Sequence, residues 1–154
     1  MMRLQAFLRL LLLLCASIAM PAMAHKASDS YLALQVNGRE VTGQWDVALR
    51  DIDFAIGLDA NGDGDITWGE VQARRADIGA WALGRLKLER GGDCSLQATE
   101  LLVDSHTDGT YAVLRLSGSC PSDAPTLALN YRLLFDIDQL HRGQLRLELD
   151  GVQH

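Results

Sequence analysis

The stretch SYLALQVNGREVTGQWDVAL, residues 30–49, carries the pattern that decides the fold. Residues 30–36 and 40–49 are predicted as two strands on either side of Asn37-Gly38, a dipeptide typical of tight hairpin turns. In the second segment apolar or small residues occupy every other position, and polar residues lie between them. Because successive side chains of a strand point to opposite faces, this alternation predicts a sheet with one buried face.

Five more segments alternate or run apolar, and turn-rich sequences separate them. They cover residues 86–90, 95–103, 110–117, 126–135 and 144–150. Several short strands with turn signals between them are typical of a β-sandwich. The chain of 154 residues has room for one ordinary domain. The sequence therefore predicts a mainly β, α+β fold: one antiparallel β-sandwich-like domain with a helical insertion after the second strand.

Two helices are expected in that insertion. Residues 51–58 predict a short helix with Phe54 and Leu58 on one face, four positions apart. Residues 70–85 predict an amphipathic helix that buries Val71 and turns its charged residues outward. Those outward residues are Arg74, Arg75 and Asp77.

Between the two helices lies DANGDGDITWGE, residues 59–70, which matches every required position of an EF-hand calcium loop, D-x-[DN]-x-[DN]-G-x5-E. Calcium takes six to eight hard oxygen ligands, so alternate loop positions turn inward and the last glutamate supplies two oxygens. The expected ligands are Asp59, Asn61 and Asp63 through their side chains, Asp65 through its carbonyl, Thr67 through a water and Glu70 with both carboxylate oxygens. The sequence predicts one Ca²⁺ in this loop.

Other features of the loop agree with that prediction. Gly64 stands where the chain must turn sharply, in a conformation that is costly for residues with a Cβ. Ile66 is expected to form a short β contact and to pack into the core. The alternatives are a solvated acidic loop, a degenerate loop without an ion, or a magnesium site. Without a cation the crowded carboxylates would repel one another, and high coordination with a bidentate glutamate favours calcium over magnesium.

A second EF-hand loop is not found in the sequence, although such loops usually occur in pairs. A single loop beside a sheet predicts a structural clamp rather than a sensor. For an exported domain the expected dissociation constant is roughly 10⁻⁵ to 10⁻³ M.

The first 24 residues have the features of a secretory signal peptide. Arg3 and Arg9 precede an apolar run, and the small residues Ala22 and Ala24 flank Met23 as at a signal-peptidase site. We expect cleavage after Ala24 and a periplasmic or secreted domain of residues 25–154. The apolar run is shorter than the roughly 18 residues of a spanning helix. Leu14 before Cys15 argues against a lipoprotein, because the residue before a lipidated cysteine is normally small.

Export has consequences for charge and for the two remaining cysteines. Removing the signal lowers the basic count from 14 to 12 against 20 acidic residues, so the formal charge moves from −6 to −8. This sign disfavours nucleic acid and anionic lipid as partners and suits cations. Cys94 and Cys120 both lie at turn-like strand ends, and in an oxidising compartment we expect them to form a disulfide.

Other residues could hold a metal or support catalysis. His25 as a new amino terminus, with His106 or His141, would suit copper or nickel. Asp136, Asp138 and His141 could also hold a transition metal, although such a cluster before Gly143 is more typical of a polar turn. No nucleophile elbow, zinc-protease motif or phosphate-binding glycine loop is present, so we expect no enzymatic activity.

Two segments, GQWDVALRDIDFAIGLDANGDGDITWGE and LFDIDQLHRG, are the most specific parts of a resemblance that covers nearly all of residues 25–154. The chain resembles the extracytoplasmic amino-terminal region of HupE/UreJ-type membrane proteins. In that family the region precedes several transmembrane helices, and relatives are associated with nickel supply to metalloenzymes. The resemblance implies one calcium-binding domain and makes a membrane-protein partner compatible with the sequence. This sequence stops at His154 before any membrane span, so transport is not carried over. A free-standing module, a truncated product and half of a split protein stay open.

Overall fold

The computed structural model describes residues 28–154, so the expected signal peptide, its cleavage site and His25 lie outside the described residues. The main sheet has six strands, which are β1 (Asp29–Asn37), β2 (Glu40–Ala48), β4 (Ser95–His106), β5 (Gly109–Ser119), β7 (Arg142–Leu149) and β8 (Val152–Gln153). Two further strands, β3 (Leu86–Glu89) and β6 (Ala128–Tyr131), form a separate ribbon. The prediction of a mainly β, α+β domain is confirmed.

The strand order in the main sheet is β4-β5-β2-β1-β7-β8. The β1–β2 hairpin forms as predicted, with Asn37 paired with Glu40 across the turn. Neighbouring strands are antiparallel except for β1 and β7, which run parallel. The prediction of a purely antiparallel sheet is therefore wrong at this one pair. There the first strand of the domain lies beside one of its last.

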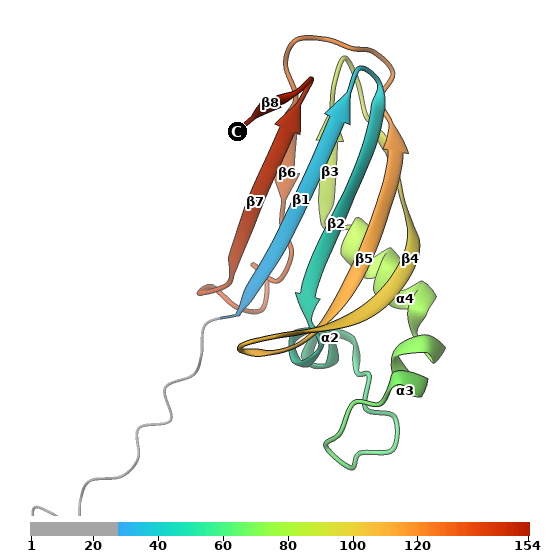
Figure 1. Ribbon diagram of the computed structural model, residues 1–154. Helices are drawn as coiled ribbons and strands as arrows, with labels where there is room; N and C mark the ends of the chain where they lie inside the picture. Colours follow the sequence, from blue (N-terminus) through green and yellow to red (C-terminus); the bar gives the residue numbers. More distant parts are fainter. Residues whose placement is uncertain (1–27) are drawn as a thin grey trace, which may run out of the picture.

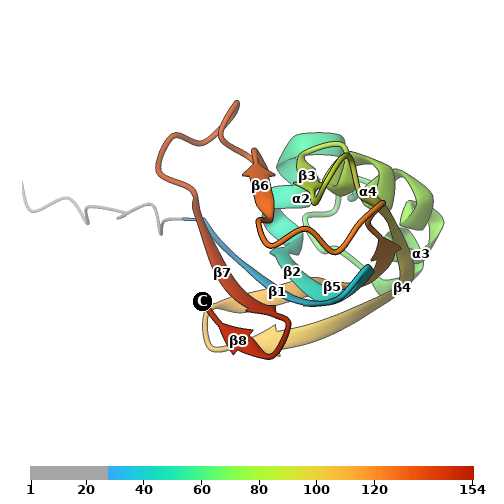
Figure 2. The same ribbon diagram turned by 90° about the horizontal axis from the view of Figure 1, so that it is seen from above.

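The second layer covers one face of the main sheet. Figures 1 and 2 show β3, β6 and the helices together on one side of it, while its other face carries no further layer of the described residues. Trp45, Leu114 and Leu32 point into the space between the layers and are almost fully buried. Gly43 lies two residues from Trp45 along β2, between Leu34 and Leu116, and a Cβ there would come within 2.6 Å of the Ala33 carbonyl oxygen. The apolar alternation of β2 thus defines the buried face, as predicted.

The predicted strand at residues 126–135 is shorter in the structure. Only residues 128–131 pair with β3. Leu133 and Leu134 are buried, but they lie in a turn in which Leu134 has a φ of 62°. In the second half of the predicted strand, the apolar residues are therefore buried without pairing to another strand.

The insertion between β2 and β3 contains three helices, α2 (Leu49–Ile56), α3 (Trp68–Ala73) and α4 (Arg75–Leu83). The prediction of one continuous helix over residues 70–85 is wrong, because the helix breaks at Arg74. The Arg74 guanidinium does not point outward as expected. It donates hydrogen bonds to the carbonyl oxygens of Ile56, at 3.1 Å, and Gly57, at 2.9 Å. The break thus lets Arg74 satisfy carbonyl groups that the end of α2 leaves without helical partners.

The buried face of α2 also differs from the prediction. Leu58 is buried as expected, but the Phe54 side chain is 78% exposed. The helix starts two residues earlier than predicted and buries Leu49 and Ile52 instead. The helix also ends at Ile56, before Leu58, so Leu58 does not share a helix face with Phe54.

The predicted disulfide is confirmed. Cys94 and Cys120 are bonded with an S–S distance of 2.04 Å and join the start of β4 to the end of β5. None of the helices within residues 28–154 has the length and hydropathy needed to cross a bilayer.

Candidate metal centre

The acidic loop of residues 59–70 connects α2 to α3, so the predicted helix–loop–helix is present (Figure 1). Gly57 is the C-cap of α2 and has a positive φ of 69°. The Asp53 carboxylate then accepts hydrogen bonds from the backbone N–H groups of Leu58, at 2.6 Å, and Asp59, at 2.9 Å. Asp53 was not among the predicted site residues. It fixes the direction in which the chain enters the loop.

The first half of the loop folds around Asp59. The two carboxylate oxygens of Asp59 accept hydrogen bonds from the N–H groups of Gly62, at 2.7 Å, and Gly64, at 2.9 Å. Both glycines have positive φ, 73° and 88°, which residues with a Cβ rarely adopt. The sharp turn predicted at Gly64 is therefore present, and the side chain at loop position one lies against it.

Asn61 and Asp63 continue the same arrangement. The Asn61 side-chain oxygen accepts from the Asp63 N–H, and the Asp63 carboxylate accepts from the Asp65 N–H, both at 2.9 Å. In each of these turns a side-chain oxygen accepts from the backbone N–H two residues further along the chain.

Glu70 joins the two ends of the loop. One of its carboxylate oxygens accepts a hydrogen bond from the Ala60 N–H at 2.9 Å, and the other accepts from the N–H of Thr67 at 2.9 Å and from its hydroxyl at 2.8 Å. Thr67 is the N-cap of α3, and together the two residues form a capping box. The hydrogen bonds from Thr67 and Ala60 lower the pKa of Glu70, so its carboxylate is ionised at neutral pH.

The loop is anchored to the core on both sides. Leu58 and Val71 are fully buried, and Ile66 packs against the core cluster from within the loop. The packing predicted for Ile66 is confirmed, but the residue belongs to no strand, so the expected β contact is absent among the described residues.

The charges of the loop are not balanced by nearby cations. Within residues 28–154, no lysine or arginine forms an ion pair with Asp59, Asp63, Asp65 or Glu70. Four carboxylates at like charge within twelve residues repel one another, and a bound cation would remove that repulsion.

Residues 28–154 contain no group of three or more histidine, cysteine, aspartate or glutamate side chains gathered closely enough to hold a metal ion, and this includes the loop. Instead, the loop carboxylates accept hydrogen bonds from successive backbone N–H groups. The donor chemistry nevertheless fits a hard cation, because every predicted ligand atom is oxygen. A carboxylate has about four lone-pair sites, so one that accepts N–H groups can still ligate an ion. Several expected ligands, such as the Asn61 amide oxygen and the Asp65 carbonyl oxygen, are not carboxylates and therefore do not count toward such a group of side chains.

The histidines named as an alternative metal site are not brought together. His141 contacts Ser30, and His106 lies against Tyr31 with ring centroids 5.4 Å apart. Ser30 and Tyr31 are successive residues of β1 and point to opposite faces of the sheet. His106 also pairs with Asp46 at 3.3 Å. The sheet therefore separates His106 from His141.

The segment with Asp136 and Asp138 is a polar turn, in agreement with the simpler interpretation. Asp136 pairs with Arg85 at 3.2 Å, and Asp138 accepts a hydrogen bond from the Leu140 N–H at 2.8 Å. These two acids and His141 do not gather into a metal-binding group among the described residues.

His141 itself is buried in a polar network that the sequence did not predict. Its ring nitrogens lie 2.7 Å from the Ser28 hydroxyl and 3.0 Å from those of Ser30 and Tyr131. The Ser28 hydroxyl donates to the Asp51 carboxylate at 2.6 Å. Burial lowers the pKa of His141, because it disfavours the charged imidazolium. The available signal was that Ser28 and Ser30 occupy alternate positions in line with the buried Leu32 and Leu34.

Comparison with models of known protein families finds no match for this chain. A comparison with curated proteins finds no match either.

Proposed function

We propose that residues 59–70 bind one calcium ion and that the ion stabilises the junction between the helical insertion and the sheet of an exported domain. The observation that carries this proposal is a complete set of EF-hand ligands in a loop whose two ends are joined by Glu70 and Ala60. The uncompensated charge of the loop carboxylates supports a cation at this place.

Each residue would supply the ligand atom that the EF-hand pattern assigns to its position. Asp59, Asn61 and Asp63 would supply one side-chain oxygen each, Asp65 its carbonyl oxygen and Glu70 both carboxylate oxygens, while Thr67 would act through a water. High coordination by oxygen favours calcium over magnesium, which keeps several waters and needs octahedral geometry.

A structural role is favoured over a sensor role. Leu58, Ile66 and Val71 tie both ends and the middle of the loop to the core, so an ion held there would connect α2 and α3 to the sheet. Sensor loops change the angle between two long helices. α3 has only six residues and is followed at once by the break at Arg74.

The test is a calorimetric titration with calcium of the wild-type domain and of Glu70→Gln. Glutamine keeps the capping box, because Gln also serves at that position, but it removes the bidentate carboxylate. Glu40→Gln is the matched control, since Glu40 is an exposed strand residue outside the loop. We expect one site per chain in the wild type and in Glu40→Gln, with a dissociation constant of roughly 10⁻⁵ to 10⁻³ M, and no measurable site in Glu70→Gln.

Two outcomes would contradict the proposal. One is wild-type heat equal to that of buffer dilution. The other is unchanged calcium binding in Glu70→Gln, which would place the ion elsewhere. Nickel should give no comparable heat, because His106 and His141 lie on opposite faces of the sheet.

Export is the second part of the proposal. The features of residues 1–24 and the Cys94–Cys120 disulfide are both compatible with an oxidising compartment. The resemblance to HupE/UreJ-type proteins supports a membrane-protein partner. Mass spectrometry of the protein isolated from a periplasmic fraction should give a chain that begins at His25, and an uncleaved cytosolic chain would contradict export.

A further inference from the structure

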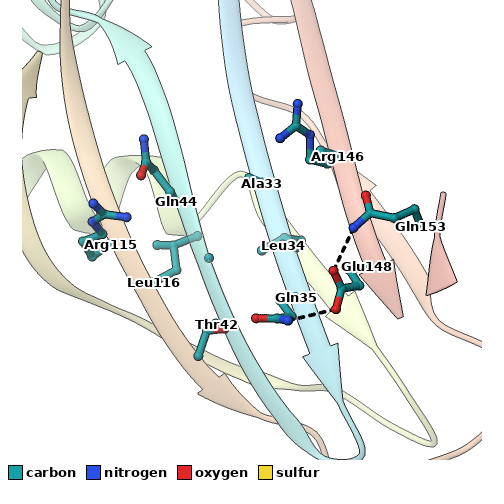
Figure 3. Close-up of a pocket in the computed structure, with 11 residues that line it drawn as sticks. Ala33, Leu34, Gln35, Thr42, Gln44, Arg115, Leu116, Arg146, Glu148 and Gln153 are labelled. Atoms are coloured by element: carbon teal, nitrogen blue, oxygen red, sulfur yellow. Dashed lines mark hydrogen bonds between the residues drawn. The ribbon is translucent and has the colours of Figure 1, made fainter. Parts of the chain in front are cut away.

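The face of the main sheet turned away from the helices, called here the open face, carries a broad hollow of about 590 Å³. It extends over β5, β2, β1 and β7 (Figure 3). A second hollow of about 320 Å³ adjoins it and shares Ala33, Gln44 and Arg146 with the first. The two hollows therefore form one continuous depression across the strands.

The pairing register defines how this depression is built. Arg115 of β5 is paired with Gln44 of β2, Gln44 with Ala33 of β1, and Ala33 with Arg146 of β7. These four residues form one row across the sheet, with an arginine at each end and a small alanine near the middle. Because three strand spacings of about 4.8 Å separate β5 from β7, the two arginine Cα atoms lie roughly 14 Å apart.

Both arginines are exposed and have no partner within residues 28–154. Neither guanidinium forms an ion pair or a hydrogen bond there, although Glu100 is the residue opposite Arg115 on β4.

Two of the acids on this face, Glu148 and Asp46, already have hydrogen-bond partners. Glu148 accepts hydrogen bonds from Gln35, at 2.9 Å, and Gln153, at 2.7 Å (Figure 3). Asp46 accepts from Gln44, at 2.7 Å, and pairs with His106. Two arginines that form no ion pair with the described residues thus lie at the ends of one hollow.

We propose that the open face binds an acidic oligosaccharide that lies across the strands, with anionic groups at Arg115 and Arg146. The planar guanidinium fork matches carboxylate and sulfate oxygens in a bidentate way. Between the arginines, the Gln44 amide and the Thr42 hydroxyl can both donate and accept hydrogen bonds, as sugar hydroxyl groups require. The small Ala33 leaves room for the ring above it.

Other anionic partners fit less well. Peptide recognition normally uses a free sheet edge or apolar side-chain pockets, whereas the row from Arg115 to Arg146 lies on a sheet face lined by polar side chains. The net charge of −6 disfavours a long polyanion such as nucleic acid, whereas a short oligosaccharide needs only the two arginine contacts. The inference does not depend on calcium binding by the loop.

The test is a titration followed by ¹⁵N–¹H NMR, in chelator-treated buffer in which circular dichroism verifies the fold. The probes are a carboxylated oligogalacturonate, a sulfated oligosaccharide, a neutral oligosaccharide of the same length and an oligoglutamate peptide. The variants are Arg115→Gln, Arg146→Gln and their double variant. The control is Arg132→Gln, since Arg132 is exposed and follows β6 on the other side of the main sheet.

We expect binding of the carboxylated or the sulfated oligosaccharide, with shifts in the side-chain amides of Gln44 and Gln35. Each single variant should weaken the affinity about fivefold and the double variant about 25-fold, as for exposed charge pairs of about 1 kcal/mol each. Arg132→Gln should bind as the wild type does. Equal binding of the neutral probe, tighter binding of oligoglutamate, an unaffected double variant, or no binding at all would each overturn the proposal.

Discussion

Arg90 offers the sharpest test of how the strand ends are held together. Its side chain is only 1% exposed, yet it carries a full charge. The guanidinium donates to the carbonyl oxygens of Gly38, at 2.6 Å, Ala124, at 2.6 Å, and Asp123, at 3.3 Å, and it pairs with the Asp150 carboxylate. One side chain thus connects the β1–β2 turn, the segment before β6 and the turn between β7 and β8.

Replacing Arg90 with methionine keeps much of the apolar stem and removes every one of these donors. Three carbonyl groups then lose their partner, and because their segments are partly exposed we take the low end of the usual cost, about 1 kcal/mol for each. We therefore expect a loss of about 3 kcal/mol from a free energy of unfolding that is about 5 to 15 kcal/mol in a typical domain. Arg90→Lys should lose less, because it keeps the charge but not the planar fork.

Urea unfolding followed by tryptophan fluorescence measures this loss, with the buried Trp45 as a reporter. For a slope of about 2 kcal/mol per molar urea, the midpoint should fall by about 1.5 M in Arg90→Met. Arg132→Met is the control, and as an exposed substitution it should stay within about 0.5 kcal/mol of the wild type. If Arg90→Met also stayed within that limit, the assignment of Arg90 as the connector of these three segments would be refuted.

Three further outcomes are expected. Calcium at a hundredfold excess over its dissociation constant should stabilise the wild type by about 2.7 kcal/mol and raise its melting midpoint by about 10 °C, whereas Glu70→Gln should melt at the same temperature with calcium and with chelator. The double variant Cys94→Ser, Cys120→Ser should be about 3.5 kcal/mol less stable, from the chain entropy of a loop that spans a separation of 26 residues; a loss below about 0.5 kcal/mol would argue against that constraint. Because burial lowers the pKa of His141, the unfolded chain takes up a proton near pH 6.5 while the folded chain does not. The free energy of unfolding should therefore fall below about pH 6.5 by up to about 1.4 kcal/mol per pH unit, and urea titrations of His141→Gln should lack this part of the slope.

Strand positions could be predicted because alternation reports which residues face the core. The segment around Trp45 illustrates this, since its odd-numbered apolar residues are buried and Thr42 is exposed. Alternation does not report which strands become neighbours. The parallel pairing of β1 with β7 depends on contacts between residues more than 100 positions apart, such as Leu32 and Leu145, and no local pattern encodes it.

The loop residues of the candidate site could be named from spacing alone, because ligand positions in such a loop are fixed by backbone geometry. The roles of the surrounding charged residues could not. Arg74 was expected in solvent and instead bonds the end of α2, while Arg90 and His141 are polar residues buried by tertiary contacts. Each satisfies partners that lie far away in the sequence, and a periodicity argument places such residues on the surface by default.

The pairing of β1 with β7 has a consequence for how the chain reaches its native state during synthesis. β1 gains its second neighbour only when residues 142–149 have been made and delivered, so the centre of the main sheet cannot close around a partial chain. Contacts of such long sequence separation slow folding and delay it until the polypeptide is nearly complete. Such late folding is compatible with the export proposed above, in which the chain would cross the membrane before it folds.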